Sequence, residues 1–208
     1  MKRFGEVTEL DRNFPAAQLE GYKRLLRMLL GDKRLAHSYN VADSARELAE
    51  QYGADPDWAY LAGLLHDICK EMPVEKQVEF AETAVPPPDE FEWNCPPVIH
   101  GIAAESYLRI ELGIENRDVL NAVRFHTVGR AGMSLLEEIV YMADLISADR
   151  DYSDVGHFRK LAHTDLKKAM FEAMEYSLKK SENRNRNVMP KTKAAYDHYL
   201  EIIKQREK

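Results

Sequence analysis

The sequence has few of the features that mark secreted or membrane proteins. Its two cysteines, Cys69 and Cys95, lie far apart and form no CxxC pair, so nothing suggests a disulfide framework and we expect both side chains to be thiols. No apolar run approaches the ~20 residues that a membrane-spanning helix needs. The N-terminal stretch MKRFGEVTELDRNF lacks the apolar middle region of a signal peptide. These absences predict a cytoplasmic protein without a membrane partner.

The chain also lacks an excess of positive charge. Its net charge of −6 over 208 residues disfavours broad electrostatic attraction to nucleic acid, so we expect no nucleic-acid polymer as a partner. The basic stretch NRNRN near the C-terminus lies among polar residues and is predicted to be an exposed loop. An acidic protein that binds phosphate needs a local cationic site, and a metal cluster would supply one.

No alternating strand pattern, internal repeat or low-complexity tract appears, and helical periodicity fills most of the chain. Asp32 and Asp55 are predicted N-caps, and Pro56 suits a first helical turn. The proline-rich segment 84–97 is predicted to be a connection. We therefore expect an all-α single domain over 1–208, with a core at roughly 18–180 and a C-terminal helical extension. The expected helices span 19–30, 33–52, 54–72, 73–83, 98–112, 116–126, 134–148, 165–182 and 191–205.

Two aspartates lie in apolar stretches of the sequence, where burial of a carboxylate would cost free energy. The stretch LAGLLHDICK places Asp67 in apolar surroundings, and IVYMADLI does the same for Asp144. A buried carboxylate costs several kcal/mol unless something pairs with it. The helices that offer partners carry histidines rather than lysines and arginines. These histidines are His37, His66, His100 and His126.

Imidazole and carboxylate groups together form a ligand set for zinc, iron, manganese or cobalt. Taken alone, a helical histidine is more often a hydrogen-bonded structural residue, and a buried aspartate is often a cap or an ion-pair partner. The joint pattern favours a metal site. Our hypothesis is that metal cations neutralise Asp67, whose two carboxylate oxygens suit the bridging of two metals.

The order of these residues resembles the HD-domain superfamily of metal-dependent phosphohydrolases: a histidine, a His-Asp pair and a distant aspartate. The blocks RLAHSYNVADSARELA, LAGLLHDICKE, HGIAAESYL and VLNAVRFHTVGRAGMSLLEEIVYMADLISADRDY are similar to the YqeK-type bacterial proteins of that superfamily. With LAHTDLKKAM, the resemblance covers roughly residues 33–170. His100 and His126 match members that hold two metals.

This resemblance implies an HD-domain helical bundle with a dinuclear transition-metal site, iron first, with manganese, cobalt or zinc as alternatives. It implies hydrolysis of symmetrical dinucleoside polyphosphates, chiefly diadenosine tetraphosphate to two ADP. This chain has Ser147-Ala148-Asp149 before Arg150, where family members often have Glu-Pro; the departure concerns substrate contacts and leaves the ligands intact. The implied metal ligands are His37, His66, Asp67, His100, His126 and Asp144.

Phosphate hydrolysis at two metals needs cationic side chains around the site, because negative charge develops on the phosphate oxygens. Arg34 lies one helical turn before His37, and Lys70 lies about one turn beyond Asp67. We predict catalytic roles for Asp67 and Lys70. The predicted substrate contacts are Arg34, Lys70, Thr127, Arg130 and Arg150. Four aromatic residues are candidates for stacking on the bases of the nucleotide, and each would suit the core equally well. They are Tyr39, Tyr107, Phe125 and Tyr152.

The sequence leaves other functions open. HD-domain enzymes also hydrolyse deoxynucleoside triphosphates, nucleoside monophosphates or cyclic nucleotides, and di-iron sites on helices also activate dioxygen. A nucleotide-binding module without turnover is a third class, which the full ligand set disfavours. A homodimer is expected from the resemblance and from the apolar terminal helices. The remaining histidines, His157, His163 and His198, fit no cluster.

Overall fold

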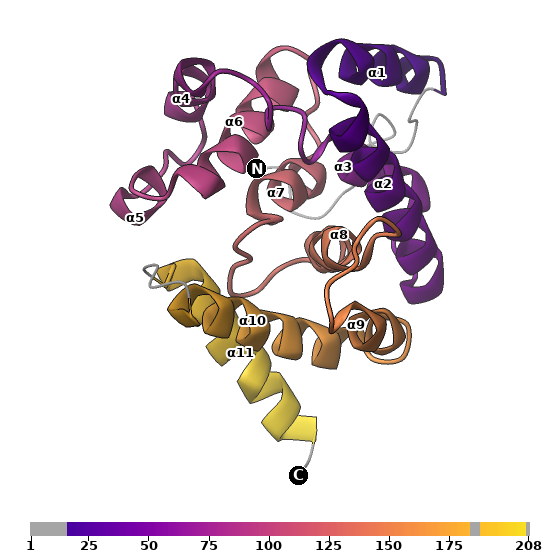
Figure 1. The fold of residues 1–208 in the computed structure, drawn as a ribbon, viewed down its shortest axis with the longest axis vertical. Helices are drawn as coiled ribbons and strands as arrows, with labels where there is room; N and C mark the ends of the chain where they lie inside the picture. The colour runs from indigo at the N-terminus through magenta and orange to yellow at the C-terminus, as the bar shows by residue number, and fades with distance from the viewer. Residues whose placement is uncertain (1–15, 184–187, 207–208) are drawn as a thin grey trace, which may run out of the picture.

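The computed structural model describes residues 16–183 and 188–206, and every regular element in these ranges is a helix. The all-α prediction is therefore confirmed. In Figure 1, α7 and α8 lie in the middle of the view, α1 and α4 lie at one end, and α10 and α11 lie at the other. The helices are α1 (Ala16–Leu29), α2 (Asp32–Tyr52), α3 (Pro56–Leu65), α4 (Val74–Glu82), α5 (Glu90–Trp93), α6 (Pro96–Ile110), α7 (Arg117–Phe125), α8 (Leu135–Ile146), α9 (Val155–Ala162), α10 (Leu166–Asn183) and α11 (Pro190–Arg206).

One of the two predicted N-caps is confirmed and the other is wrong. The Asp55 carboxylate accepts hydrogen bonds from the backbone N–H groups of Asp57 and Trp58, at 2.9 and 3.1 Å, directly before Pro56. Asp32 is instead the first residue of α2, and Gly31 occupies the cap position without a side-chain bond. In the first turn the negative charge of Asp32 still favours the helix through its dipole.

The helix predicted over 54–72 ends at Leu65, seven residues short of its expected limit. Beyond it the backbone forms turns, with bonds from Ile68 N–H to the Leu65 carbonyl at 3.1 Å and from Lys70 N–H to the Asp67 carbonyl at 2.9 Å. Apolar periodicity continues through these turns because Ile68 and Cys69 are fully buried. The His-Asp pair therefore lies in a turn at the end of a helix, and not on a helix face.

Two short helices were not predicted. Within the proline-rich connection, α5 begins at a capping box in which Asp89 and Glu92 each bond to the other's backbone N–H at 2.9 Å. The second, α9, buries Val155 and Phe158 against the core. Both are too short for periodicity to reveal them, although the spacing of Asp89 and Glu92 was a readable signal.

The main core is continuous from α2 and α3 through α8 to the C-terminal helices. Ala195 and Tyr199 of α11 are fully buried in it, so the predicted extension packs as part of the same core. The Tyr199 hydroxyl donates a 2.7 Å hydrogen bond to the buried carboxylate of Glu138 on α8. The basic stretch 183–187 lies mostly outside the described residues. None of the described helices is long and apolar enough to cross a bilayer.

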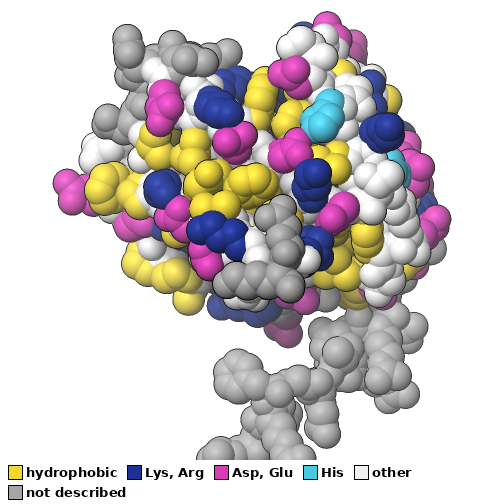
Figure 2. All heavy atoms as spheres, turned by 90° about the horizontal axis from the view of Figure 1, so that it is seen from below, with side chains coloured by type: hydrophobic (Ala, Val, Ile, Leu, Met, Phe, Trp, Pro, Cys, Tyr) yellow, Lys and Arg dark blue, Asp and Glu magenta, His cyan; other side chains and the backbone are white. Residues whose placement is uncertain are grey.

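Charged side chains of both signs share the surface at the end of the molecule where α9, α10 and α11 lie. Figure 2 shows basic and acidic side chains alternating there around small hydrophobic patches. On this face neither sign gathers into a continuous area. Such a mixed surface is typical of proteins that attract polyanions only weakly.

Close packing of α2 against α3 depends on Gly63. A Cβ atom at this position would lie 2.9 Å from the Ala42 Cα and 3.0 Å from the Val41 carbonyl oxygen, both backbone atoms. We predict that Gly63→Ala lowers the free energy of unfolding by about 1–3 kcal/mol, because the helices must separate. Urea denaturation measures this. Gly21→Ala is the control: nothing lies within 4 Å of its Cβ, and alanine is the better helix former. Equal effects of the two substitutions would contradict the packing argument.

Candidate metal centre

The six predicted ligands meet in the middle of the fold. His37 comes from α2, His100 from α6 and Asp144 from α8, while His66 and His126 directly follow α3 and α7. The His37 Nε2 lies 3.0 Å from an Asp144 carboxylate oxygen. Asp67 lies at the centre: its carboxylate oxygens are 3.4, 3.1 and 3.6 Å from the Nε2 atoms of His66, His100 and His126.

Three groups within this cluster bring their ligand atoms within 4.8 Å of one another, the spacing needed to hold a metal ion. Asp67 belongs to two groups, one shared with His37 and His66 and the other with His100 and His126. The third group joins His66, His126 and Asp144. A single carboxylate thus connects two sets of imidazoles, and all of these side chains come from elements that only folding brings together.

Two of the histidines are oriented by the ends of their own helices. The Nδ1–H of His66 donates to the Gly63 carbonyl at 2.6 Å, and that of His126 donates to the Val123 carbonyl at 2.6 Å. Both carbonyls belong to the last turn of a helix, where acceptors lack an intrahelical partner. Because a carbonyl only accepts, Nδ1 carries a proton in both residues. Burial disfavours the charged ring of His66, but the neighbouring Asp67 carboxylate raises its pKa. In the neutral imidazole, Nε2 keeps its lone pair. That lone pair is the one that binds a metal.

His37 is oriented by a side chain that the sequence did not single out as functional. Its Nδ1 lies 2.8 Å from the carboxylate of Asp149, whose second oxygen accepts from the Asn40 amide at 3.2 Å. Asp149 belongs to the segment in which this chain departs from the Glu-Pro of its family. The contact with His37 could not be predicted from the sequence, because 112 residues separate the two side chains.

Unsatisfied buried atoms show that this cluster fits a cation. Among the described residues, the Nε2 atoms of His37 and His66 and the Oδ1 of Asp67 are buried without a hydrogen bond. Buried polar atoms normally have partners, and leaving one unpaired costs free energy. A divalent metal accepts electron pairs from these very atoms, so the residues present suit such an ion in number and chemistry.

The protonation states of the cluster also suit a cation. Burial favours a neutral carboxyl, yet the neighbouring imidazoles of His66, His100 and His126 hold the pKa of Asp67 well below its usual range. For Asp144, burial is likewise outweighed by His37 and His66, and its pKa is lowered. Burial lowers the pKa of His100 to about 4. At neutral pH both carboxylates are therefore charged and His100 is neutral.

Three of the five predicted substrate contacts form a cationic rim above the buried ligands. Arg34 contacts Asp67 at 2.7 Å, Lys70 lies 3.7 Å from Asp67, and Arg150 is paired with Asp144. The side chains of Arg34, Lys70 and Arg150 are 30%, 33% and 36% exposed, whereas Asp67 beneath them is 3% exposed. Solvent-borne anions can therefore reach the rim. Burial lowers the pKa of Lys70.

The other two predicted contacts differ from each other. The Thr127 hydroxyl lies 3.0 Å from the His126 Nε2, so Thr127 adjoins the cluster. Arg130 instead donates two hydrogen bonds, at 2.7 and 2.6 Å, to the buried carboxylate of Glu137, and it lies over the Phe125 ring. The charge of Arg130 is already neutralised by a bidentate partner, which the sequence did not indicate.

The aromatic candidates for base stacking are mostly engaged in the core. Tyr107 packs edge-to-face against a phenylalanine, Tyr152 stacks on another tyrosine, and Phe125 is buried. Tyr39 packs partly buried against the main core. The three histidines that fitted no cluster lie elsewhere, as predicted: His157 contacts Glu172, His163 contacts Gln51, and His198 packs against Tyr199.

Comparison with known families matches this architecture. The sequence model of the HD domain covers residues 34–149, more than half of the chain, and this range contains every ligand of the cluster. The chain belongs to the HD domain family. Its HD domain begins at Arg34 of the rim and ends at Asp149, the partner of His37.

Relatives of known description narrow the assignment within the HD domain family. A Bacillus subtilis protein described as a symmetrical bis(5'-nucleosyl)-tetraphosphatase is 33% identical over 172 residues, 83% of this chain and 92% of the relative. A Staphylococcus aureus protein of the same description is 33% identical, over 74% of this chain and 80% of the relative. These matches confirm the resemblance to the YqeK-type group.

A solved structure agrees with the fold. The crystal structure of a predicted HD superfamily hydrolase involved in NAD metabolism, from Clostridium acetobutylicum, superposes with a TM-score of 0.84 at 34% identity. The match covers 88% of this chain and 97% of the other. The bundle described above is thus shared with that predicted HD superfamily hydrolase over nearly the whole length of the other chain.

We predict that Asp149→Ala weakens divalent-metal binding about 10–100-fold, because His37 loses the carboxylate that orients its ring. Titration of the metal-free protein with Mn²⁺ or Co²⁺ in a calorimeter measures this without reference to turnover. Asp149→Asn should retain more affinity, since an amide oxygen still accepts from Nδ1–H. An exposed aspartate paired only with Arg46, Asp57, supplies the control Asp57→Ala. Unchanged affinity in Asp149→Ala would show that the contact does not orient the ligand.

Proposed function

We propose that this protein is a metal-dependent phosphoanhydride hydrolase that cleaves symmetrical dinucleoside polyphosphates, chiefly diadenosine tetraphosphate to two ADP. The observation that carries the proposal is the buried His/Asp cluster beneath a rim of three cationic side chains, in a chain whose relatives are described as symmetrical tetraphosphatases. In such a site the buried cluster binds metal cations, and the cationic rim binds the polyphosphate.

A dinuclear centre is supported by the position of Asp67 in two ligand groups. His37 and His66 would serve one metal, His100 and His126 the other, and Asp144 would complete the set. The ligands suit iron, manganese, cobalt or zinc, and the family resemblance places iron first. When bound, the metals polarise phosphate oxygens and lower the pKa of a coordinated water.

The chain's own residues hold and orient the polyphosphate. Arg34 and Arg150 at present neutralise Asp67 and Asp144, and cations bound to these carboxylates would leave guanidinium donors available to phosphate oxygens. The Lys70 ammonium lies 3.1 Å from the His100 Nε2, at the entrance to the cluster. There it would offset the charge that develops on the departing ADP. The Thr127 hydroxyl supplies a neutral donor on the opposite side, beside His126.

The state of the two cysteines is consistent with the expectation of a cytoplasmic protein. Both cysteines are thiols, Cys69 being fully buried, which suits a reducing compartment such as the cytoplasm. We infer a nucleotide as the substrate and a nucleoside diphosphate as the product. The homodimer stays a prediction, which sedimentation of the purified protein would test.

The direct test is product analysis by chromatography after metal-loaded protein is incubated with diadenosine tetraphosphate. ADP is expected as the sole nucleotide product, because symmetrical cleavage breaks the central linkage. AMP together with ATP would contradict symmetrical cleavage. Absence of cleavage with iron, manganese and cobalt would contradict the hydrolase assignment.

Asp67→Ala should abolish both metal binding and turnover, because it removes the carboxylate common to two ligand groups. A second readout is thermal: metal should raise the Tm of the native protein by binding only the folded state, and should leave the Tm of the variant unchanged. Asp57→Ala again serves as the control. Full activity in Asp67→Ala would overturn the proposed site.

A further inference from the structure

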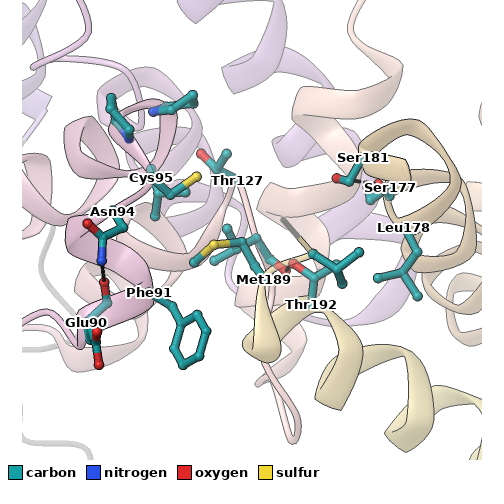
Figure 3. Close-up of a pocket in the computed structure, with 15 residues that line it drawn as sticks. Glu90, Phe91, Asn94, Cys95, Thr127, Ser177, Leu178, Ser181, Met189 and Thr192 are labelled. Carbon is teal, nitrogen blue, oxygen red and sulfur yellow. Dashed lines mark hydrogen bonds between the residues drawn. The ribbon is translucent and has the colours of Figure 1, made fainter. Parts of the chain in front are cut away.

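A cavity of about 650 Å³ lies beside the metal centre, between the start of α6 and the C-terminal helices. Figure 3 shows Phe91, Asn94 and Cys95 on one wall, Ser177, Leu178 and Ser181 on the other, and Thr127 and Met189 between them. Its volume falls within the roughly 300–1,000 Å³ of small-molecule sites. Neither the predicted ligands nor the cationic rim accounts for it.

Two segments join this cavity to the metal centre. Thr127 lines the cavity, and its hydroxyl lies 3.0 Å from the His126 Nε2. Pro96 and Pro97 also line it, and they precede His100 on α6 by four and three residues, which places them on the same helix face one turn away. Both histidines of one ligand group thus have a neighbour in the cavity wall.

The chemistry of the cavity is opposite to that of the rim. Among the described residues that line it, Glu90 is the single charged one, and no lysine or arginine is present. Phe91, which is 54% exposed, and Met189 supply apolar surface, while Asn94 and the hydroxyls of Ser181 and Thr127 supply polar atoms. Such a wall lacks the cations that would hold a phosphate, and it suits an uncharged aromatic group with polar edges.

We infer that this cavity binds one nucleoside of the dinucleotide, with the polyphosphate extending past Thr127 onto the metal centre and its rim. The inference rests on the proposed function and specifies where that substrate is held. Charge decides the orientation: the anionic half meets Arg34, Lys70 and Arg150, and the uncharged half meets a wall whose described residues include no lysine or arginine. A nucleoside held here would set which phosphorus lies at the metals, which is what symmetrical cleavage requires.

Filling the cavity tests this inference in the metal-loaded protein. Ser181→Trp places an indole in the cavity, and we expect KM for diadenosine tetraphosphate to rise about tenfold with little change in kcat, since binding and not chemistry is impaired. Glu182→Trp is the control, because Glu182 is the next residue of α10, is exposed and does not line the cavity. Matching Tm values show that both variants fold. An unchanged KM in Ser181→Trp would overturn the inference.

Cys95 provides a second test that does not depend on turnover. It lines the cavity and is partly exposed, whereas Cys69 is fully buried, so N-ethylmaleimide should label Cys95 selectively. Adenosine should slow this labelling of the metal-loaded protein, and inorganic tripolyphosphate should not. No protection by adenosine would overturn the nucleoside site even if diadenosine tetraphosphate is cleaved. Protection without cleavage would support the nucleoside site and reject the proposed reaction.

Discussion

Burial of Asp67 among three imidazoles, with the partly exposed Asp144 beside it, is the constraint on which the rest of this structure depends. Asp67 and Asp144 are charged at neutral pH, and only part of their charge is offset by Arg34 and Arg150 at the surface. Buried Nε2 and carboxylate atoms remain without hydrogen bonds. Buried charges in proteins are normally paired or bound to a metal, and the helices here bring histidine and aspartate ligand atoms close enough together to suit a cation.

Helix ends contribute as many residues to the centre as helix faces do. His66 and His126 follow the last residues of α3 and α7, and each uses a terminal carbonyl of its own helix to fix the tautomer that binds metal. A histidine in mid-helix has no such free carbonyl. His37 is inside α2, and a carboxylate from the segment after α8, Asp149, orients it instead.

The centre separates two regions of opposite chemistry. One is the exposed cationic rim, and the other is the cavity, whose described wall is largely uncharged. A dinucleoside polyphosphate has the same division between its anionic chain and its uncharged ends. Thr127 belongs to both regions, since it contacts His126 and lines the cavity. A single loop residue therefore connects the His/Asp cluster to the cavity that we propose for the nucleoside.

Local sequence determined most of the longer helices, the cap at Asp55 and the residue types of the predicted ligands, because periodicity and capping act over one or two turns. Arg130 shows where local reasoning ended: it was predicted from the sequence as a substrate contact, and the sequence did not indicate that the fold pairs it with Glu137. The role of Asp149 and the presence of the cavity could not be predicted from the sequence for the same reason. They depend on segments that approach only when the core forms, and the geometry of such contacts is decided by packing across the whole chain, not by the sequence near any one residue.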